Sequence, residues 1–130
     1  MQKIVFSNNI YMIQIPVSIG EAVDKITILR IKKQKIPNAA AKINEEIILI
    51  TKIIKDYNVE EKYFIDLQDV NQKLWHIEDD IRIKEKKNEF DEEFIQLARN
   101  VYKNNDARFK IKSEINNKYN SNILEFKHFT

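Results

Sequence analysis

Helical periodicity over residues 67–117 constrains the fold more than any other feature. Apolar side chains recur there at steps of three and four, on both sides of a five-residue polar break at 87–91. Before the break they are Leu67, Val70, Leu74, Ile77 and Ile81, and after it Phe94, Leu97, Ala98, Val101 and Tyr102. This spacing places one apolar stripe along each helix. Because the break is short, the sequence predicts a hairpin of two antiparallel helices.

A second helical hairpin is predicted before the first. Ser18 and, three residues later, Glu21 have the form of a capping box, so we expect a helix over about 19–35. Its apolar residues lie on two flanks, which indicates contact with two neighbours. A further helix is expected over about 39–57, with Asn38 as its cap.

The two ends of the chain favour a minor β element. Residues 3–6 and 11–15 are rich in β-branched and aromatic side chains, and they form either a small hairpin or one strand with a leader. The tail, residues 123–129, is expected to add a short strand beside 11–15. One glycine and two prolines argue against an all-β chain. The predicted fold is therefore an all-α bundle of antiparallel helical hairpins with this β element, in a single domain spanning 1–130.

Composition excludes several classes of function. The chain has no cysteine, so it holds no disulfide and no thiolate site. Its 22 basic and 20 acidic residues leave a net charge of +2, which gives no strong attraction to nucleic acid. No apolar run approaches the length of a membrane span. We therefore expect a cytoplasmic protein with neither a membrane nor a nucleic acid as its partner.

An acidic run at residues 78–80, with Glu85 nearby, is a candidate cation site. Metal sites in helical bundles draw carboxylates from several helices, often with a Glu-x-x-His motif, and that motif is absent here. Charge runs are usually solvated faces. The sequence predicts no metal and no cofactor.

Polar residues border the apolar stripes of the predicted 67–117 hairpin. Folding that hairpin about Glu89 brings Asn71 and Glu78 within reach of Asn105 and Arg108. We expect a polar network at the helix–helix contact that fixes register more than it stabilises. Its candidate members are Asn71, Glu78, Arg82, Arg99, Asn105, Asp106 and Arg108.

Two further readings concern side chains beside these stripes. The arginines of the candidate network are also suited to holding an anionic ligand through paired hydrogen bonds. Trp75 and Tyr102 are either edges of the core with a hydrogen-bonded polar tip or exposed contacts for a partner.

Three blocks of the chain resemble a small bacterial and phage family of unknown function, DUF6165. The blocks read IPVSIGEAVDKITIL (15–29), VNQKLWHIEDDIRIKE (70–85) and FDEEFIQLARNVYKNNDARFKIKSEIN (90–116). The resemblance implies no established activity. Members are often encoded beside sugar-transfer and surface-polysaccharide functions, which adds sugar nucleotides to the conceivable ligands.

Two functions from different classes follow from these patterns. The leading hypothesis is a non-enzymatic interaction or assembly module that associates with itself or with a protein partner, because the helices carry more apolar face than a small bundle hides. The alternative is a binder of, or enzyme acting on, a phosphorylated or carboxylated metabolite, with Glu78, Arg82, Arg99, Asn105 and Arg108 at its site. No catalytic residue is predicted. Arginines that open into a pocket without carboxylate partners would favour the alternative.

Overall fold

A computed structural model describes residues 4–5 and 11–129 of the chain. The helices within these residues are α1 (Ile19–Lys35), α2 (Ala40–Ile54), α3 (Glu61–Lys86) and α4 (Glu92–Lys118). Short 3-10 turns, Pro37–Ala39 and Lys55–Tyr57, flank α2. The expected all-α fold is confirmed.

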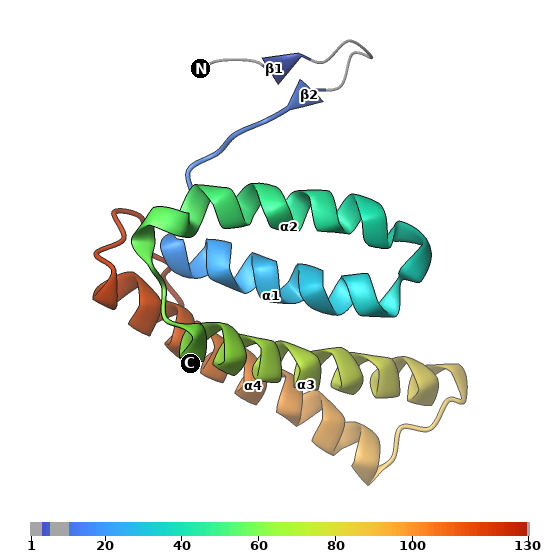
Figure 1. The fold of residues 1–130 in the computed structure, drawn as a ribbon. Helices are drawn as coiled ribbons and strands as arrows, with labels where there is room; N and C mark the ends of the chain where they lie inside the picture. Colours follow the sequence, from blue (N-terminus) through green and yellow to red (C-terminus); the bar gives the residue numbers. More distant parts are fainter. Residues whose placement is uncertain (1–3, 6–10, 130) are drawn as a thin grey trace.

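Helix α1 occupies the centre of the bundle. It lies against α2 on one side and against both α3 and α4 on the other (Figure 1). Helices α3 and α4 are antiparallel neighbours, as their periodicity predicts. Helix α2 lies beside α1 and beside neither α3 nor α4. As a result α1 is buried on two sides, whereas Ile54 is the only fully buried residue of α2.

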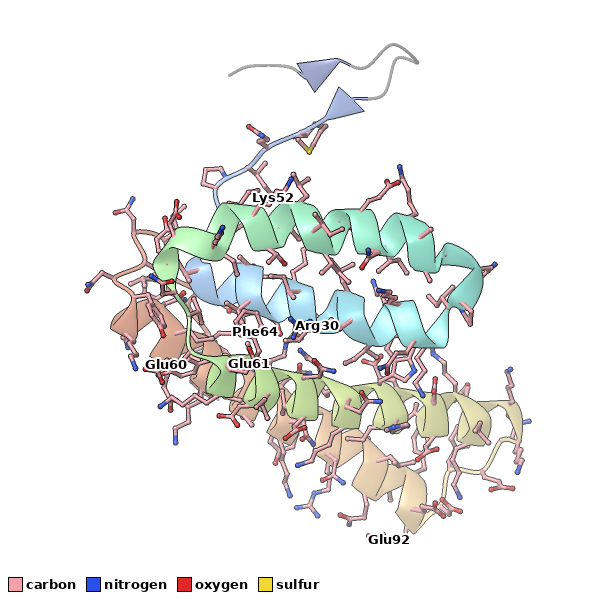
Figure 2. All side chains as sticks on the ribbon, in the orientation of Figure 1. Arg30, Lys52, Glu60, Glu61, Phe64 and Glu92 are labelled. Atoms are coloured by element: carbon pink, nitrogen blue, oxygen red, sulfur yellow. The ribbon has the colours of Figure 1, made fainter. Side chains whose placement is uncertain are left out.

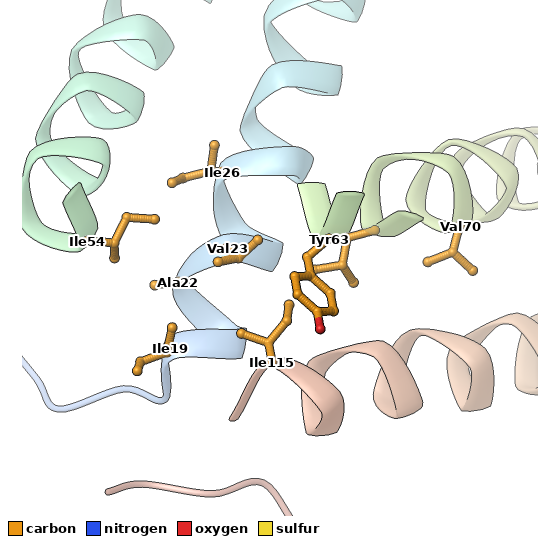
Figure 3. Close-up of a cluster of buried hydrophobic side chains, with 9 residues drawn as sticks. Ile19, Ala22, Val23, Ile26, Ile54, Tyr63, Val70 and Ile115 are labelled. Atoms are coloured by element: carbon orange, nitrogen blue, oxygen red, sulfur yellow. The ribbon is translucent and has the colours of Figure 1, made fainter. Parts of the chain in front are cut away.

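The apolar core lies at the end of the bundle where α1 and α3 begin and α4 ends (Figure 3). Val23 of α1, Leu67 of α3 and Ile115 of α4 are each completely buried there. Full burial of such a side chain contributes roughly 1.5–3 kcal/mol. Further along, the Arg30 guanidinium stacks over the ring of Phe64, 5.2 Å from its centroid, and extends the contact between α1 and α3 (Figure 2).

Side chains cap two of the helices, and one of these caps is incomplete. Ser18 accepts a hydrogen bond from the Glu21 amide at 3.0 Å, and Asp91 accepts one from the Phe94 amide at 3.0 Å. The second half of the predicted capping box does not form. The Glu21 carboxylate binds Lys112 of α4 at 2.8 Å, because a cation offers it a stronger hydrogen bond than the Ser18 amide.

The predicted cap at Asn38 is wrong. Asn38 lies inside the 3-10 turn that Pro37 begins, and α2 starts with no side-chain cap. The amides of Ala39 and Ala40 bond to the carbonyls of Ile36 and Pro37 instead. The 3-10 turn thus supplies backbone acceptors for amides that a side-chain cap would otherwise accept from.

The two chain ends behave differently. Strands β1 (Ile4–Val5) and β2 (Tyr11–Met12) pair antiparallel, so the N-terminal hairpin forms, although residues 3 and 6–10 lie outside the described part. The predicted strand at 123–129 is wrong. These residues lie along α4 without a backbone ladder, held by side chains. Lys127 pairs with Asp106 at 2.6 Å, and the Phe129 ring meets that of Phe109 at 5.8 Å between centroids.

No helix of the described residues is long and apolar enough to cross a membrane.

Candidate functional site

A buried group of polar side chains lies where α1, α3 and α4 meet. We call it the Asp24 cluster, and its members are Asp24, Thr27, Asn71, Arg108 and Lys112. The carboxylate of Asp24 is completely buried, so its charge needs partners inside the protein. Asp24 and Thr27 are three residues apart on α1 and therefore share one face of that helix.

The hydrogen bonds to Asp24 come from two other helices. Arg108 of α4 donates through Nε to Oδ1 at 3.0 Å and through Nη2 to Oδ2 at 2.5 Å, which is a bidentate pair. Asn71 of α3 donates through Nδ2 to Oδ1 at 2.8 Å and to Thr27 Oγ1 at 3.0 Å. The hydrogen bond with Asp24 raises the pKa of Arg108, so this guanidinium stays charged. Among the described residues, no buried side-chain polar atom lacks a partner.

Lys112 joins the cluster to the tail. Only 6% of its side chain is exposed, and its Nζ lies 2.8 Å from Glu21, 2.7 Å from Glu125 and 3.9 Å from Asp24. Burial lowers the pKa of Lys112, but the hydrogen bonds to Glu125 and Glu21 outweigh this effect and leave the pKa raised. Lys112 therefore remains a cation that holds α1, α4 and the tail together.

The first turn of α1 touches the last turns of α4 directly. The amide of Gly20 donates to Asn116 Oδ1 at 2.7 Å, and that of Ile19 donates to Ser121 Oγ at 3.1 Å. A Cβ placed on Gly20 would lie 2.6 Å from the backbone oxygen of Lys112. The absence of a side chain at Gly20 therefore sets how closely α1 and α4 approach, and the approach positions Lys112 beside Glu21.

The structure brings together only part of the candidate network. Asn71 and Arg108 belong to the Asp24 cluster, but the partner of Arg108 is Asp24 and not the expected Glu78. The side chains of Glu78, Arg82 and Arg99 are exposed and form no hydrogen bond or ion pair with a described residue. The reason is that α1 lies beside the α3–α4 hairpin and offers a buried carboxylate.

Three other predicted residues of α4 lie beside the tail, residues 123–129. Asp106 pairs with Lys127, and Asn105 lines two hollows between α4 and the tail. The first, of about 420 Å³, also has Arg108 and Lys112 in its wall, and the second is about 560 Å³. Tyr102 is 56% exposed and lines the second hollow.

Trp75 is half-buried on α3, so it is not one of the fully buried core residues. Nowhere in the described ranges do three His, Asp or Glu side chains gather in a way that would hold a metal ion. Glu78, Asp79 and Asp80, the run weighed as a cation site, are all exposed on α3.

The sequence reasoning missed Asp24, Lys112 and Glu125. A signal for Asp24 was present, because it and Thr27 are polar residues between the two apolar flanks of α1. Such a position is buried if both flanks are covered. No comparable signal marks Glu125, which lies in a tail without regular structure.

An apolar surface runs from the N-terminal segment onto α2. Residues 12–17, which we call the arm, leave the start of α1 and pass beside α2 (Figure 1). The arm exposes Ile13, Ile15 and Val17, with Ile13 at 81% and Ile15 at 72%. The neighbouring face of α2 exposes Leu49 and Ile53. We call these five residues the arm–α2 face; a largely apolar groove of about 530 Å³ runs along it.

These features define an all-α bundle built around a buried ion cluster. The chain belongs to a family of unknown function, DUF6165, whose family model matches residues 13–130, in agreement with the resemblance of its three blocks. No curated protein and no solved structure gave a match.

Proposed function

We propose that this chain is a non-enzymatic assembly module that pairs with a second copy of itself through the arm–α2 face. The observation that carries the proposal is the uneven burial of α2. That helix covers α1, buries Ile54 alone, and leaves Leu49 and Ile53 exposed next to the apolar arm. Contiguous exposed apolar side chains on a small protein mark an interaction surface.

The shape of the surface favours a second copy as the partner. Ile13, Ile15 and Val17 alternate with Gln14 and Pro16 along the arm, and all three apolar side chains are exposed beside the groove. The arm is thus an apolar ridge beside an apolar helix face. A two-fold axis can place the arm of each copy on α2 of the other, which is the self-complementary contact that a symmetric dimer requires. The small net charge of +2 adds little repulsion between copies.

The N-terminal hairpin adds to this argument. In the part of the chain that the structure describes, β1 and β2 contact each other and no helix. A two-stranded hairpin alone is marginally stable in water. Contact with a second copy would supply the support that the bundle of its own chain does not give.

The arginines support a module rather than an enzyme. Arg108 is paired with Asp24, and Arg82 and Arg99 face solvent on the outer parts of α3 and α4. The hollow that Arg108 borders has no second arginine in its wall. A site for a multiply charged metabolite would need several arginines without carboxylate partners in one pocket, and Arg108 is already paired with Asp24.

The test is the mass of the chain in solution. Light scattering coupled to size exclusion, at micromolar concentration, is expected to give about twice the chain mass of 15.6 kDa. Ile15→Glu and Ile53→Glu change exposed residues, so folding should be preserved while dimer affinity falls at least about tenfold each. Ile83→Glu is the matched control, because Ile83 is 51% exposed but lies on α3, away from the arm–α2 face. A monomer at about 100 μM, or equal weakening by the Ile83 change, would refute the proposal.

A further inference from the structure

The contact between Lys112 and Glu125 joins a rigid group to a loosely held one. Lys112 is nearly buried and fixed by Glu21, whereas Glu125 comes from an exposed segment without regular secondary structure. That segment is also held by the partly exposed Lys127–Asp106 pair, by Lys127 over the ring of Phe109, and by an edge contact of Phe129 with the same ring. Such contacts are individually weak, so the Glu125 carboxylate can leave Lys112 without disturbing the core.

Two residues beside Lys112 have hydrogen-bond donors without a partner in the described part of the chain. Arg108 spends Nε and Nη2 on Asp24, and its Nη1 has no partner among the described residues. The side-chain amide of Asn105 likewise forms no hydrogen bond within the described part of the chain. Both residues line the 420 Å³ hollow, together with Lys112, Phe109 and Glu125. This volume lies within the range of small-molecule sites.

We propose that this hollow is a binding site for a small carboxylate ligand, and that Glu125 occupies the carboxylate position until a ligand displaces it. The ligand carboxylate would bind Lys112 in place of Glu125, with Arg108 Nη1 and Asn105 as additional donors. The body of the ligand would lie against the ring of Phe109. This site uses different residues from the arm–α2 face and does not depend on the proposed dimer.

Charge selects a carboxylate over a phosphate. With Glu125 displaced, the charges of Arg108 and Lys112 are balanced by those of Asp24 and Glu21. One carboxylate restores the single negative charge that Glu125 supplies in the present structure. A phosphate dianion would bring a second negative charge close to buried Asp24, and like charges at short range in a low-dielectric site repel strongly.

Glu125 also competes with the ligand carboxylate for Lys112. A ligand binds only the fraction of molecules in which the tail has released Lys112, so its apparent affinity is reduced by that fraction. Removing the Glu125 charge should release this competition. If the tail occupies the site in about nine molecules of ten, Glu125→Gln raises ligand affinity about tenfold.

The experiment is an NMR titration of the full chain with 3-phenylpropanoate, which carries one carboxylate and one ring. Amide and side-chain signals of Asn105, Arg108 and Lys112 should shift, and Glu125→Gln should tighten binding about tenfold. The neutral amide of the same compound should produce no shift. Glu114→Gln is the matched control, because Glu114 is exposed on α4 and pairs with no described residue; it should leave the affinity unchanged.

Three results would overturn the proposal. They are the absence of binding to the Glu125→Gln chain at about 10 mM ligand, equal binding of the neutral amide, and tighter binding of inorganic phosphate than of 3-phenylpropanoate. A further check uses Asn105→Ala, which removes a donor without touching the Asp24 cluster. Weaker binding by this folded variant supports the site, and unchanged binding contradicts the assigned role of Asn105.

Discussion

Replacement of Arg108 by methionine tests whether the Asp24 cluster is a true buried ion pair. The side chain of Arg108 provides three of the hydrogen bonds to Asp24, which is completely buried. Arg108→Met keeps the unbranched apolar stem of the side chain and removes the guanidinium with its charge. Asp24 would then remain inside the protein with Asn71 at 2.8 Å and Lys112 at 3.9 Å as its partners.

The expected loss follows from this geometry. Removing one partner of a buried ion pair typically lowers the free energy of unfolding by about 3–5 kcal/mol. The lower end applies here, because 27% of the Arg108 side chain is exposed and Lys112 compensates part of the charge on Asp24. We therefore expect a loss of about 3 kcal/mol, which lowers the melting temperature of a domain of this size by roughly 10 °C.

Urea unfolding followed by circular dichroism measures this loss directly. Arg99→Met is the control, because Arg99 is exposed on the same helix and its replacement should change stability by no more than about 0.5 kcal/mol. The double variant Asp24→Asn/Arg108→Met removes both charges and should be more stable than Arg108→Met alone. A loss below about 1 kcal/mol for Arg108→Met, or a double variant less stable than the single one, would refute this reasoning.

Two further predictions concern helix packing and acid stability. Gly20→Ala should lower the free energy of unfolding by about 1–3 kcal/mol despite the better helix propensity of alanine, because the new Cβ meets the backbone of Lys112; unchanged stability in urea would contradict this. The hydrogen bond from Lys84, and then that from the Phe94 amide, lowers the pKa of Asp91. The stability this gives is present above the unfolded pKa of about 3.9 and is lost as pH falls through the lower folded pKa. The melting temperature, measured from neutral to acid pH, should therefore fall less steeply below about pH 4 for Asp91→Asn than for the unchanged chain. Identical profiles would show the reasoning to be wrong.

Local patterns were sufficient to predict most of the helices. The Ser18 cap and the apolar spacing after it predict a helix over 19–35, and α1 has those bounds. The break at 87–91 predicts antiparallel α3 and α4, and these helices are neighbours. Such features depend on residues within a few positions of each other, which is the range over which sequence periodicity carries information.

The partner of Arg108 was not predictable in the same way. Aligning the two helices of the hairpin can pair only side chains of those helices. The alignment therefore predicts Glu78 as the partner of Arg108. Asp24 belongs to α1, which packs against the α3–α4 hairpin from a distant part of the sequence. The tail was mistaken for a strand for a similar reason, because its alternating side chains do not reveal that Glu125 and Lys127 bind α4 individually.

The position of Asp24 has a consequence for the order of folding during synthesis. Its bond to Arg108 spans 84 residues, and the amide of Gly20 reaches its acceptor in Asn116 across 96. Contacts between residues so far apart in sequence form late, because the entropy cost of closing the intervening loop must be overcome first. A nascent chain can form α1 and α2 early, but their inner face carries a carboxylate that is stable there only beside a cation. That face therefore stays hydrated until α4 has emerged from the ribosome, so the synthesis of α4 decides when the inner face of α1 can be buried.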